Sequence, residues 1–282
     1  MRCAWTGFIK ILPLWLRENV DKFGFGILQE LRLRLNHPPS LVTSKGNMSI
    51  QGNVSADDLR FVINMASRYS PWTATSLANG YLTAPGGHRI GVCGRIVTEK
   101  GIMTGFNSVT SVCIRISKDF PNIAKAIKGT TGSVLIIGRP GSGKTTLLRD
   151  LIRQEGNRGN GAVAVIDERE EIFPIVQGNY CFYVGEQVDI LSGCRKSQGI
   201  DTVLRSMSPT VIAVDEITAE EDCNALLHAG WCGVRLFATA HADSKQDLIK
   251  RSIYRPIVEK KLFDTLIVLA ADKTWHEERL DL

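Results

Sequence analysis

A glycine-rich stretch in the middle of the chain has the residue types and spacing of a phosphate-binding loop. It reads GRPGSGKT, fits the pattern GxxxxGK[ST], and lies between the apolar run SVLIIG and a helical run. In such a loop, backbone N–H groups converge on phosphates at the positive N-terminus of the following helix. The residues expected to contact the nucleotide are Gly138, Arg139, Pro140, Gly141, Ser142, Gly143, Lys144, Thr145 and Thr146. Lys144 should reach the outer phosphates, so we expect ATP as the ligand.

Two adjacent acids follow a second apolar run, TVIAVDE. Asp215 and Glu216 would lie at the carboxyl tip of a buried strand, where sheets of this kind bind ligands. Asp215 and the hydroxyl of Thr145 are the expected magnesium site. Glu216 could polarise the attacking water as the catalytic acid–base group. Adjacent acids at a strand end otherwise often cap helices, and the phosphate loop upstream favours the catalytic interpretation.

A third apolar run, AVAVIDERE, also ends in acids. These are Asp167, Glu168, Glu170 and Glu171. At least one is expected to orient water or metal, and the others are expected to be solvated. Glu168 is therefore a second candidate for the catalytic acid, and the sequence leaves the choice between Glu168 and Glu216 open.

A lone histidine follows the run LFATAHADS, which ends in Thr239 and His241. If this strand lies between the phosphate-loop strand and the Asp215 strand, His241 would point at the terminal phosphate and could sense it. A single histidine is otherwise more often a structural residue.

Buried strands that alternate with amphipathic helices must position these groups. From Ser133 onward the apolar runs SVLIIG, AVAVID, TVIAVDE, VRLFATAH and TLIVLA are separated by helical patterns. This order is typical of a parallel α/β sheet. We therefore predict one α/β domain over residues 131–282.

The first part of the chain has a different pattern. Residues 28–36 alternate strictly, with Leu31 and Leu33 on one side, and the run 79–117 reads as antiparallel strands joined by tight turns. Apolar residues between 8 and 16 recur at helical spacing, and Ser55 is placed to cap a helix over 55–70. Residues 1–130 are thus predicted to form a smaller α+β domain.

Charge and cysteine content narrow the class of protein. Residues 1–130 contain 16 Lys and Arg against 7 Asp and Glu, whereas the remainder contains 18 against 22. A basic first domain suggests an anionic partner or a solvated basic face. The seven scattered cysteines favour neither a disulfide framework nor a zinc site and fit a reducing cytosol. No run approaches the ~18 apolar residues of a membrane span.

Taken together, these elements resemble the secretion-type ATPase superfamily of type II and type IV systems. A small N-terminal sheet domain, a Walker A loop, an acidic box, a Walker B glutamate and a histidine box TAH follow in the same order. The segments QELRLRLN, NGYLTAPGGHRIGVCGRI, MSPTVIAVDEI and ATAHADS are more similar to the stage III sporulation AA family of endospore-forming bacteria. This resemblance covers nearly the whole chain.

The resemblance implies a RecA-like P-loop core and a ring motor, expected to be a hexamer. The ATPase would lie in the mother-cell cytoplasm, peripheral to the membrane and docked on membrane subunits of the channel to the forespore. In related motors, arginines of the N-terminal sheet domain approach a neighbour's nucleotide. The candidates here are Arg89, Arg95 and Arg115.

Two other classes of function remain open. A nucleic-acid-associated P-loop ATPase is disfavoured because the roughly forty residues after His241 show no separate basic, aromatic-rich module. A nucleotide-gated scaffold with little turnover is disfavoured by the intact set Lys144, Thr145, Asp215 and Glu216, although sequence alone does not give a rate.

Overall fold

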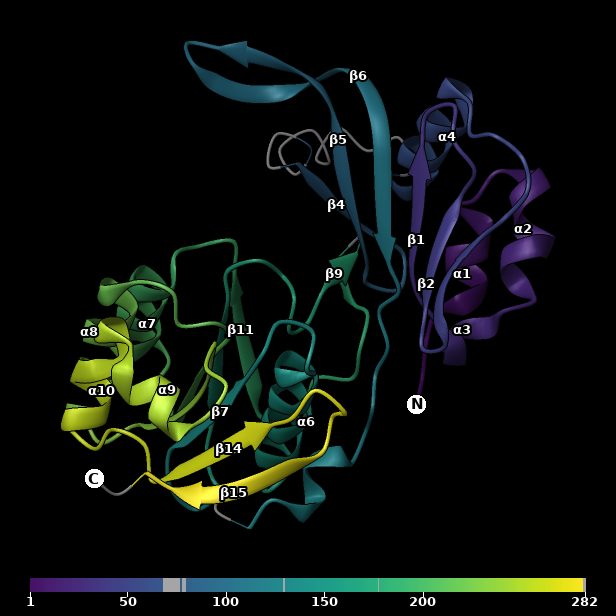
Figure 1. Ribbon diagram of the computed structural model, residues 1–282. Coiled ribbons are helices and arrows are strands. Elements are labelled where there is room, and N and C mark those ends of the chain that lie inside the picture. The colour runs from purple at the N-terminus through teal and green to yellow at the C-terminus, as the bar shows by residue number, and fades with distance from the viewer. Residues whose placement is uncertain (68–76, 78–79, 129, 177, 281–282) are drawn as a thin grey trace. The chain divides into compact units, whose positions relative to one another are not determined.

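The chain folds into two compact units, as the computed structural model shows for residues 1–67, 77, 80–128, 130–176 and 178–280 (Figure 1). The first unit comprises Met1–Asp119 and Pro174–Phe182, and the second comprises Phe120–Phe173 and Tyr183–Leu282. The domain boundary predicted near residue 130 lies inside the second unit. The return of residues 174–182 to the first unit was not expected from the sequence.

A six-stranded antiparallel sheet forms the centre of the first unit, in the order β3-β2-β1-β6-β5-β4. The strands are β1 (Leu28–Arg34), β2 (Ser40–Thr43), β3 (Gly46–Ser49), β4 (Tyr81–Ala84), β5 (His88–Glu99) and β6 (Ile102–Arg115). Leu31 and Leu33 are fully buried while Arg34 is exposed, which confirms the predicted alternation. The last strand of the predicted run 79–117 is the long β6, which ends at Arg115.

The first unit has four described helices. They are α1 (Trp5–Lys10), α2 (Leu14–Asp21), α3 (Gly24–Ile27) and α4 (Ala56–Ser67). Of these, α1, α2 and α4 contribute to its hydrophobic core. The predicted opening helix is divided because Pro13, which has no N–H to donate, stands at the N-cap of α2. The predicted cap of α4 is confirmed: the Asp58 N–H donates to Ser55 Oγ over 3.1 Å. Residues 68–70 of that predicted helix lie outside the described residues.

The segment Pro174–Phe182 adds a small two-stranded ribbon to the first unit. It consists of β9 (Ile175–Val176) and β10 (Asn179–Tyr180). The ribbon lies against the β4–β5 turn at Gly87, where an added Cβ would come within 3.2 Å of Pro174. Gly87 has φ +78°, so the tight turn and the close approach both require glycine here.

A seven-stranded sheet forms the centre of the second unit, in the order β11-β8-β12-β13-β7-β14-β15. The strands are β7 (Val134–Gly138), β8 (Val163–Asp167), β11 (Val188–Ser192), β12 (Val211–Val214), β13 (Arg235–Ala240), β14 (Thr265–Leu269) and β15 (Trp275–Arg279). All neighbours pair in parallel except β14 and β15. Strand β13 therefore lies between β12 and β7, which confirms the condition attached to His241.

Helices cover both faces of this sheet. They are η1 (Ile123–Ala126), α6 (Lys144–Gly156), α7 (Lys196–Ser206), α8 (Glu220–Trp231), α9 (Lys245–Lys250), η2 (Ser252–Tyr254) and α10 (Arg255–Glu259). Alternate strand residues, such as Ile212 and Leu236, pack with α7, α8 and α10 in one core. Figure 1 shows α6 on the other side of the sheet. The predicted α/β fold with a smaller α+β unit is confirmed.

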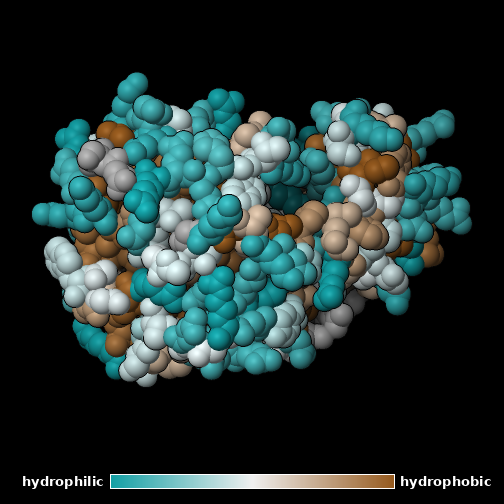
Figure 2. All heavy atoms as spheres, turned by 90° about the horizontal axis from the view of Figure 1, so that it is seen from below, coloured by the Kyte–Doolittle hydropathy of each residue, from teal (hydrophilic) through white to brown (hydrophobic). Residues whose placement is uncertain are grey.

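The surface mixes polar and apolar residues. The face in Figure 2 is mostly hydrophilic, with hydrophobic residues in small groups. Among the described helices, none is long and apolar enough to cross a membrane.

Candidate nucleotide site

The loop between β7 and α6 has the backbone conformation that the glycine pattern predicts. Gly141 and Gly143 have φ +76° and +107°, in the left-handed region that favours glycine. A Cβ on Gly138 would come within 2.6 Å of Ser142 Oγ and 3.0 Å of the Leu269 carbonyl oxygen, so the loop packs closely around this glycine. Arg139 and Pro140 are exposed, and the Arg139 guanidinium pairs with Asp243 at 2.8 Å. Thr146 lies half-buried in the first turn of α6.

Lys144 opens helix α6 with its side chain buried in the loop. Its Nζ donates to the carbonyl oxygens of Gly138 at 3.0 Å and Arg139 at 3.1 Å, and lies 3.1 Å from Nδ1 of His241. Burial lowers the pKa of the Lys144 ammonium, while Glu216 and Asp215 act in the opposite direction. The side chain is thus held in place at the mouth of the loop.

Asp215 follows β12 and receives two hydroxyl hydrogen bonds. Thr145 Oγ1 donates to Asp215 Oδ2 at 2.6 Å, and Thr239 Oγ1 donates to Asp215 Oδ1 at 2.5 Å. Burial raises the pKa of the Asp215 carboxyl, and the two hydroxyl groups partly counter this effect. The structure therefore brings together the two residues predicted to bind magnesium.

Glu216 stands between a histidine and an arginine. Its Oε1 lies 3.1 Å from Nε2 of His241, and its Oε2 lies 3.6 Å from Nη1 of Arg169. The Glu216 backbone has φ +50°, a conformation that non-glycine residues adopt rarely and at some cost. The side chains of Lys144, His241 and Glu216 thus form one contiguous polar chain.

The acids after β8 are mainly occupied with local structure. The Asp167 carboxylate accepts the N–H groups of residues 171, 172 and 173 at 2.8 to 3.0 Å and so holds the following loop. Burial raises the pKa of Asp167 to about 6. Glu168 Oε2 lies 2.5 Å from Nζ of the buried Lys196, which also lies 3.8 Å from Asp222. Burial raises the pKa of the Glu170 carboxyl as well.

The three arginine candidates lie on β5 and β6 of the first unit. Arg89 and Arg115 are direct partners in the register of these strands, and Arg95 is opposite Ser108. The Arg89 guanidinium lies 4.5 Å from the centre of the Tyr81 ring, and Arg115 pairs with Glu30 at 3.3 Å.

Three contributors to the site were not predicted from the sequence. They are the hydroxyl of Thr239, the guanidinium of Arg169 and the buried ammonium of Lys196. The position of Thr239 at the end of β13, two residues before His241, was the available signal for the first. Lys196 is far from the acids in sequence, and nothing in its surroundings indicated a buried ion pair.

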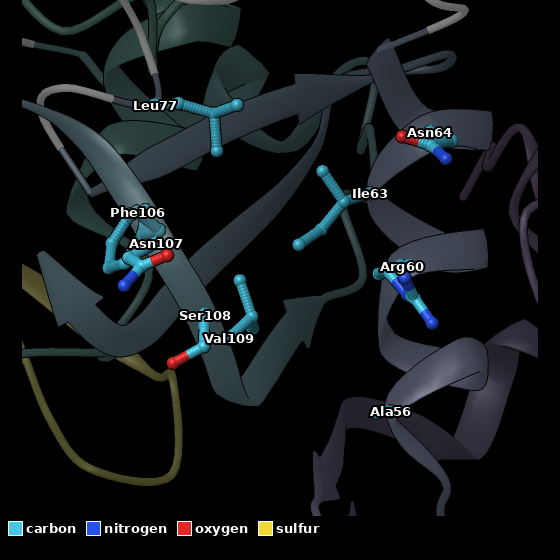
Figure 3. A pocket seen from close by; sticks show the side chains of 9 residues that line it. All are labelled: Ala56, Arg60, Ile63, Asn64, Leu77, Phe106, Asn107, Ser108 and Val109. Carbon is cyan, nitrogen blue, oxygen red and sulfur yellow. The ribbon is translucent and has the colours of Figure 1, made fainter. Parts of the chain in front are cut away.

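A groove in the first unit offers a different kind of surface. It has a volume of about 510 Å³, and Figure 3 shows it between helix α4 and strand β6, with Ile63 and Val109 among its lining side chains. Arg60 is the one charged residue among the described lining, and it pairs with Asp57. These described lining residues therefore include no set of acid–base or phosphate-binding groups.

Solved structures show which proteins share this fold. The ATPase DotB of Legionella pneumophila superposes with a TM-score of 0.54 and 18% identity, covering 95% of this chain and 80% of that one. The pilus retraction motor PilT, solved with bound ADP, superposes with a TM-score of 0.61 and 16% identity, covering 89% and 76%. The fold is that of the RecA-like secretion ATPases.

The family is narrower than this class. The chain belongs to the family described as sporulation stage III, protein AA, whose sequence pattern matches residues 8–278. It is 36% identical over 256 residues to the stage III sporulation protein AA of Bacillus subtilis (strain 168), covering 87% of this chain and 83% of the relative.

Proposed function

We propose that this protein hydrolyses ATP to ADP and phosphate. The observation that carries the proposal is the convergence of Lys144, Thr145, Asp215, Glu216 and His241 at the carboxyl ends of β7, β12 and β13. In parallel α/β sheets this edge is where ligands bind. Lysine, hydroxyl, carboxylate and histidine groups together match the needs of phosphoryl transfer to water.

The chain supplies suitable ligands for magnesium. Thr145 Oγ1 and Asp215 Oδ2 are hard oxygen donors 2.6 Å apart, and magnesium is bound by few protein ligands together with phosphate oxygens and water. Among the described residues there is no cluster of three or more His, Cys, Asp or Glu that could hold a metal alone. Magnesium bound by Thr145 and Asp215 would neutralise charge on the phosphates.

Glu216 is the better candidate for the residue that orients water. Glu168 is bound to Lys196 at 2.5 Å. Glu216 lies 3.6 Å from Arg169 and contacts His241, which in turn contacts Lys144. A carboxylate in this position can accept a proton from the attacking water. We propose that His241 links Lys144, the phosphate-binding lysine, with Glu216.

We further propose that the ATPase works as a ring, expected to be a hexamer, with an arginine supplied by the neighbouring subunit. Arg89 and Arg115 are adjacent and could approach a phosphate together, with Arg95 as a third candidate. A guanidinium at the terminal phosphate would stabilise transition-state charge and couple hydrolysis to subunit movement. PilT is a pilus retraction motor, which supports a motor function by analogy of fold.

The family suggests where such a motor would act. We infer a role in energising a sporulation channel, with the protein in the mother-cell cytoplasm and bound at the membrane to channel subunits. The membership in the sporulation family supports this proposal.

ATP hydrolysis by the purified chain tests the function. Lys144→Ala and Glu216→Gln should each lower turnover at least tenfold, since they remove phosphate binding and water orientation. Glu221→Gln, an exposed acid on α8, is the matched control and should not change turnover. Wild-type turnover that neither site substitution lowers would reject the mechanism. Binding of ATP without turnover would indicate a nucleotide-gated scaffold, and a monomeric mass with ATP would reject the ring.

A further inference from the structure

We propose that Thr239 is a positioning residue that holds Glu216 in register with Asp215, an inference that rests on the proposed function. Thr239 is fully buried near the end of β13, the strand between the phosphate-loop strand and the Asp215 strand. Its hydroxyl accepts the Glu216 N–H at 2.8 Å and donates to Asp215 Oδ1 at 2.5 Å.

The hydroxyl of Thr239 has one proton, and this fixes the direction of both bonds. Asp215 can only accept when ionised, so the proton of Thr239 points to Asp215 and a lone pair points to the Glu216 N–H. Asp215 Oδ2 is held in the same way by Thr145. One hydrogen-bond chain therefore runs from the first turn of α6, through Asp215 and Thr239, to the backbone of Glu216.

The backbone of Glu216 needs such support. A φ of +50° is unfavourable for a residue with a side chain, and it persists only where neighbouring groups fix it. Thr239 supplies two of these groups, because its carbonyl oxygen also accepts the Ile217 N–H at 2.9 Å. The two consecutive N–H groups after Asp215 are thus both bound by one residue.

This arrangement gives Thr239 a role beyond packing. With its backbone fixed, Glu216 directs its carboxylate to His241 at 3.1 Å. The same hydroxyl holds the carboxylate predicted to bind magnesium. Through Thr239, the position of Glu216 therefore depends on the position of Asp215.

Thr239→Val and Thr239→Ser separate the hydroxyl from the methyl group. Valine keeps the shape and removes the hydroxyl, so kcat should fall at least tenfold while the affinity for a fluorescent ATP analogue changes less than threefold. Serine keeps the hydroxyl, so kcat should stay within threefold of wild type. The matched control is Thr43→Val in the first unit, which removes another buried hydroxyl, bonded to Gly46 at 2.7 Å, and should leave kcat unchanged.

Several outcomes would overturn the proposal. They are a Thr239→Val enzyme with kcat within twofold of wild type, a serine variant as impaired as the valine variant, and a loss confined to ATP affinity. If the valine variant does not fold, Thr239→Cys, which has a weak donor and similar size, should give a kcat between those of wild type and Lys144→Ala.

A crystal structure of the folded variant gives a readout that needs no turnover. In Thr239→Val, we expect Glu216 to leave the left-handed region and to lose its contact with His241. An unchanged Glu216 would overturn the role of Thr239, even if the wild-type protein proved inactive. Absence of wild-type turnover would instead reject the proposed function, so the two failures are distinguishable.

Discussion

Lys144 and His241 are in direct contact, with 3.1 Å between Nζ and Nδ1. An ammonium group can only donate, so Nδ1 accepts and the ring proton of the neutral imidazole lies on Nε2. Nε2 then donates to Glu216 Oε1 at 3.1 Å. Lys144 and Glu216, the proposed phosphate-binding and water-orienting residues, are therefore linked through one imidazole of defined tautomer.

Replacement of this histidine should slow hydrolysis without preventing nucleotide binding. In His241→Ala, Glu216 loses the donor that orients it, and we expect kcat to fall by about 100-fold, in the range of acid–base and positioning effects. Steady-state kinetics and ATP-analogue binding measure the two effects separately. His228→Ala, at an exposed position on α8, is the control. A kcat equal to that of wild type would contradict the assigned link.

Part of this site could be predicted from the sequence, because the ends of buried strands can be recognised in it. The carboxyl ends of parallel strands meet at one edge, so Asp215 could be placed near the phosphate loop from the pattern of apolar runs. The placement of His241 required in addition that β13 lie between β7 and β12, which is the order that the structure shows. The different contacts of Glu168 and Glu216 could not be predicted. Glu168 pairs with Lys196 on helix α7, and local sequence patterns contain no information on such a contact.

The same limit applies to the fold. Alternation predicted β1, and continuous apolar runs predicted β7, β8, β12, β13 and β14 of the second unit, since burial of one or both faces dictates these patterns. The path of residues 174–182 was missed because it depends on long-range contacts, such as that of Pro174 with the turn at Gly87. The break between α1 and α2 could have been predicted, because Pro13 interrupts the helical run.

Lys196 should be important for stability. Its side chain is 6% exposed, and Lys196→Met would leave Glu168 and Asp222 without their cation. Loss of one partner of a buried pair costs about 3 kcal/mol, and the partial exposure of Glu168 reduces this, so we expect a loss of about 2 kcal/mol in the free energy of unfolding. Urea denaturation measures it. The exposed Lys250→Met should change stability by less than about 0.5 kcal/mol, and an equal effect of both would refute the pair's role.

Asp167 should make stability depend on pH. Burial raises its pKa from 3.8 to about 6 in the folded state, so the folded chain binds a proton more tightly than the unfolded chain. The resulting stabilisation is fully present below pH 3.8 and is lost as the pH rises through about 6. It amounts to about 3 kcal/mol, at 1.36 kcal/mol per unit of pKa.

Comparison with Asp167→Asn isolates this contribution, because asparagine does not titrate. The variant has only one acceptor oxygen for three N–H groups and should be less stable throughout. The difference between the unfolding free energies of wild type and variant should shrink by about 2 kcal/mol between pH 4 and pH 7, which is most of the full contribution. Parallel curves over this range would contradict the raised pKa.

Tyr254 should couple the two strand ends that carry Glu216 and His241. Its buried hydroxyl accepts the His241 N–H and donates to the Ile217 carbonyl, both at 3.3 Å. Tyr254→Phe leaves both groups unpaired, so we expect a loss of about 1 to 2 kcal/mol in stability and a lower kcat. Tyr183→Phe removes an exposed hydroxyl bond to Asn157 and should change neither. Thermal denaturation and turnover that are identical for both variants would argue against the coupling.

Mixing of subunits can determine whether Arg89 acts on a neighbour. If it does, Arg89→Gln and Glu216→Gln proteins should each be impaired, because a guanidinium and a water-orienting carboxylate are both needed at one phosphate. In mixed rings, some interfaces join an intact Arg89 to an intact Glu216, so turnover should exceed the average of the two separate proteins.

The control mixture is Lys144→Ala with Glu216→Gln. Both residues belong to the same subunit's site, so each subunit of this mixture retains a defect and no recovery is expected. Arg115→Gln and Arg95→Gln, tested in the same way, would identify which candidate is supplied in trans. If the mixture with Arg89→Gln shows no more recovery than the control mixture, the Arg89 guanidinium acts within its own subunit, where it lies 4.5 Å from the centre of the Tyr81 ring.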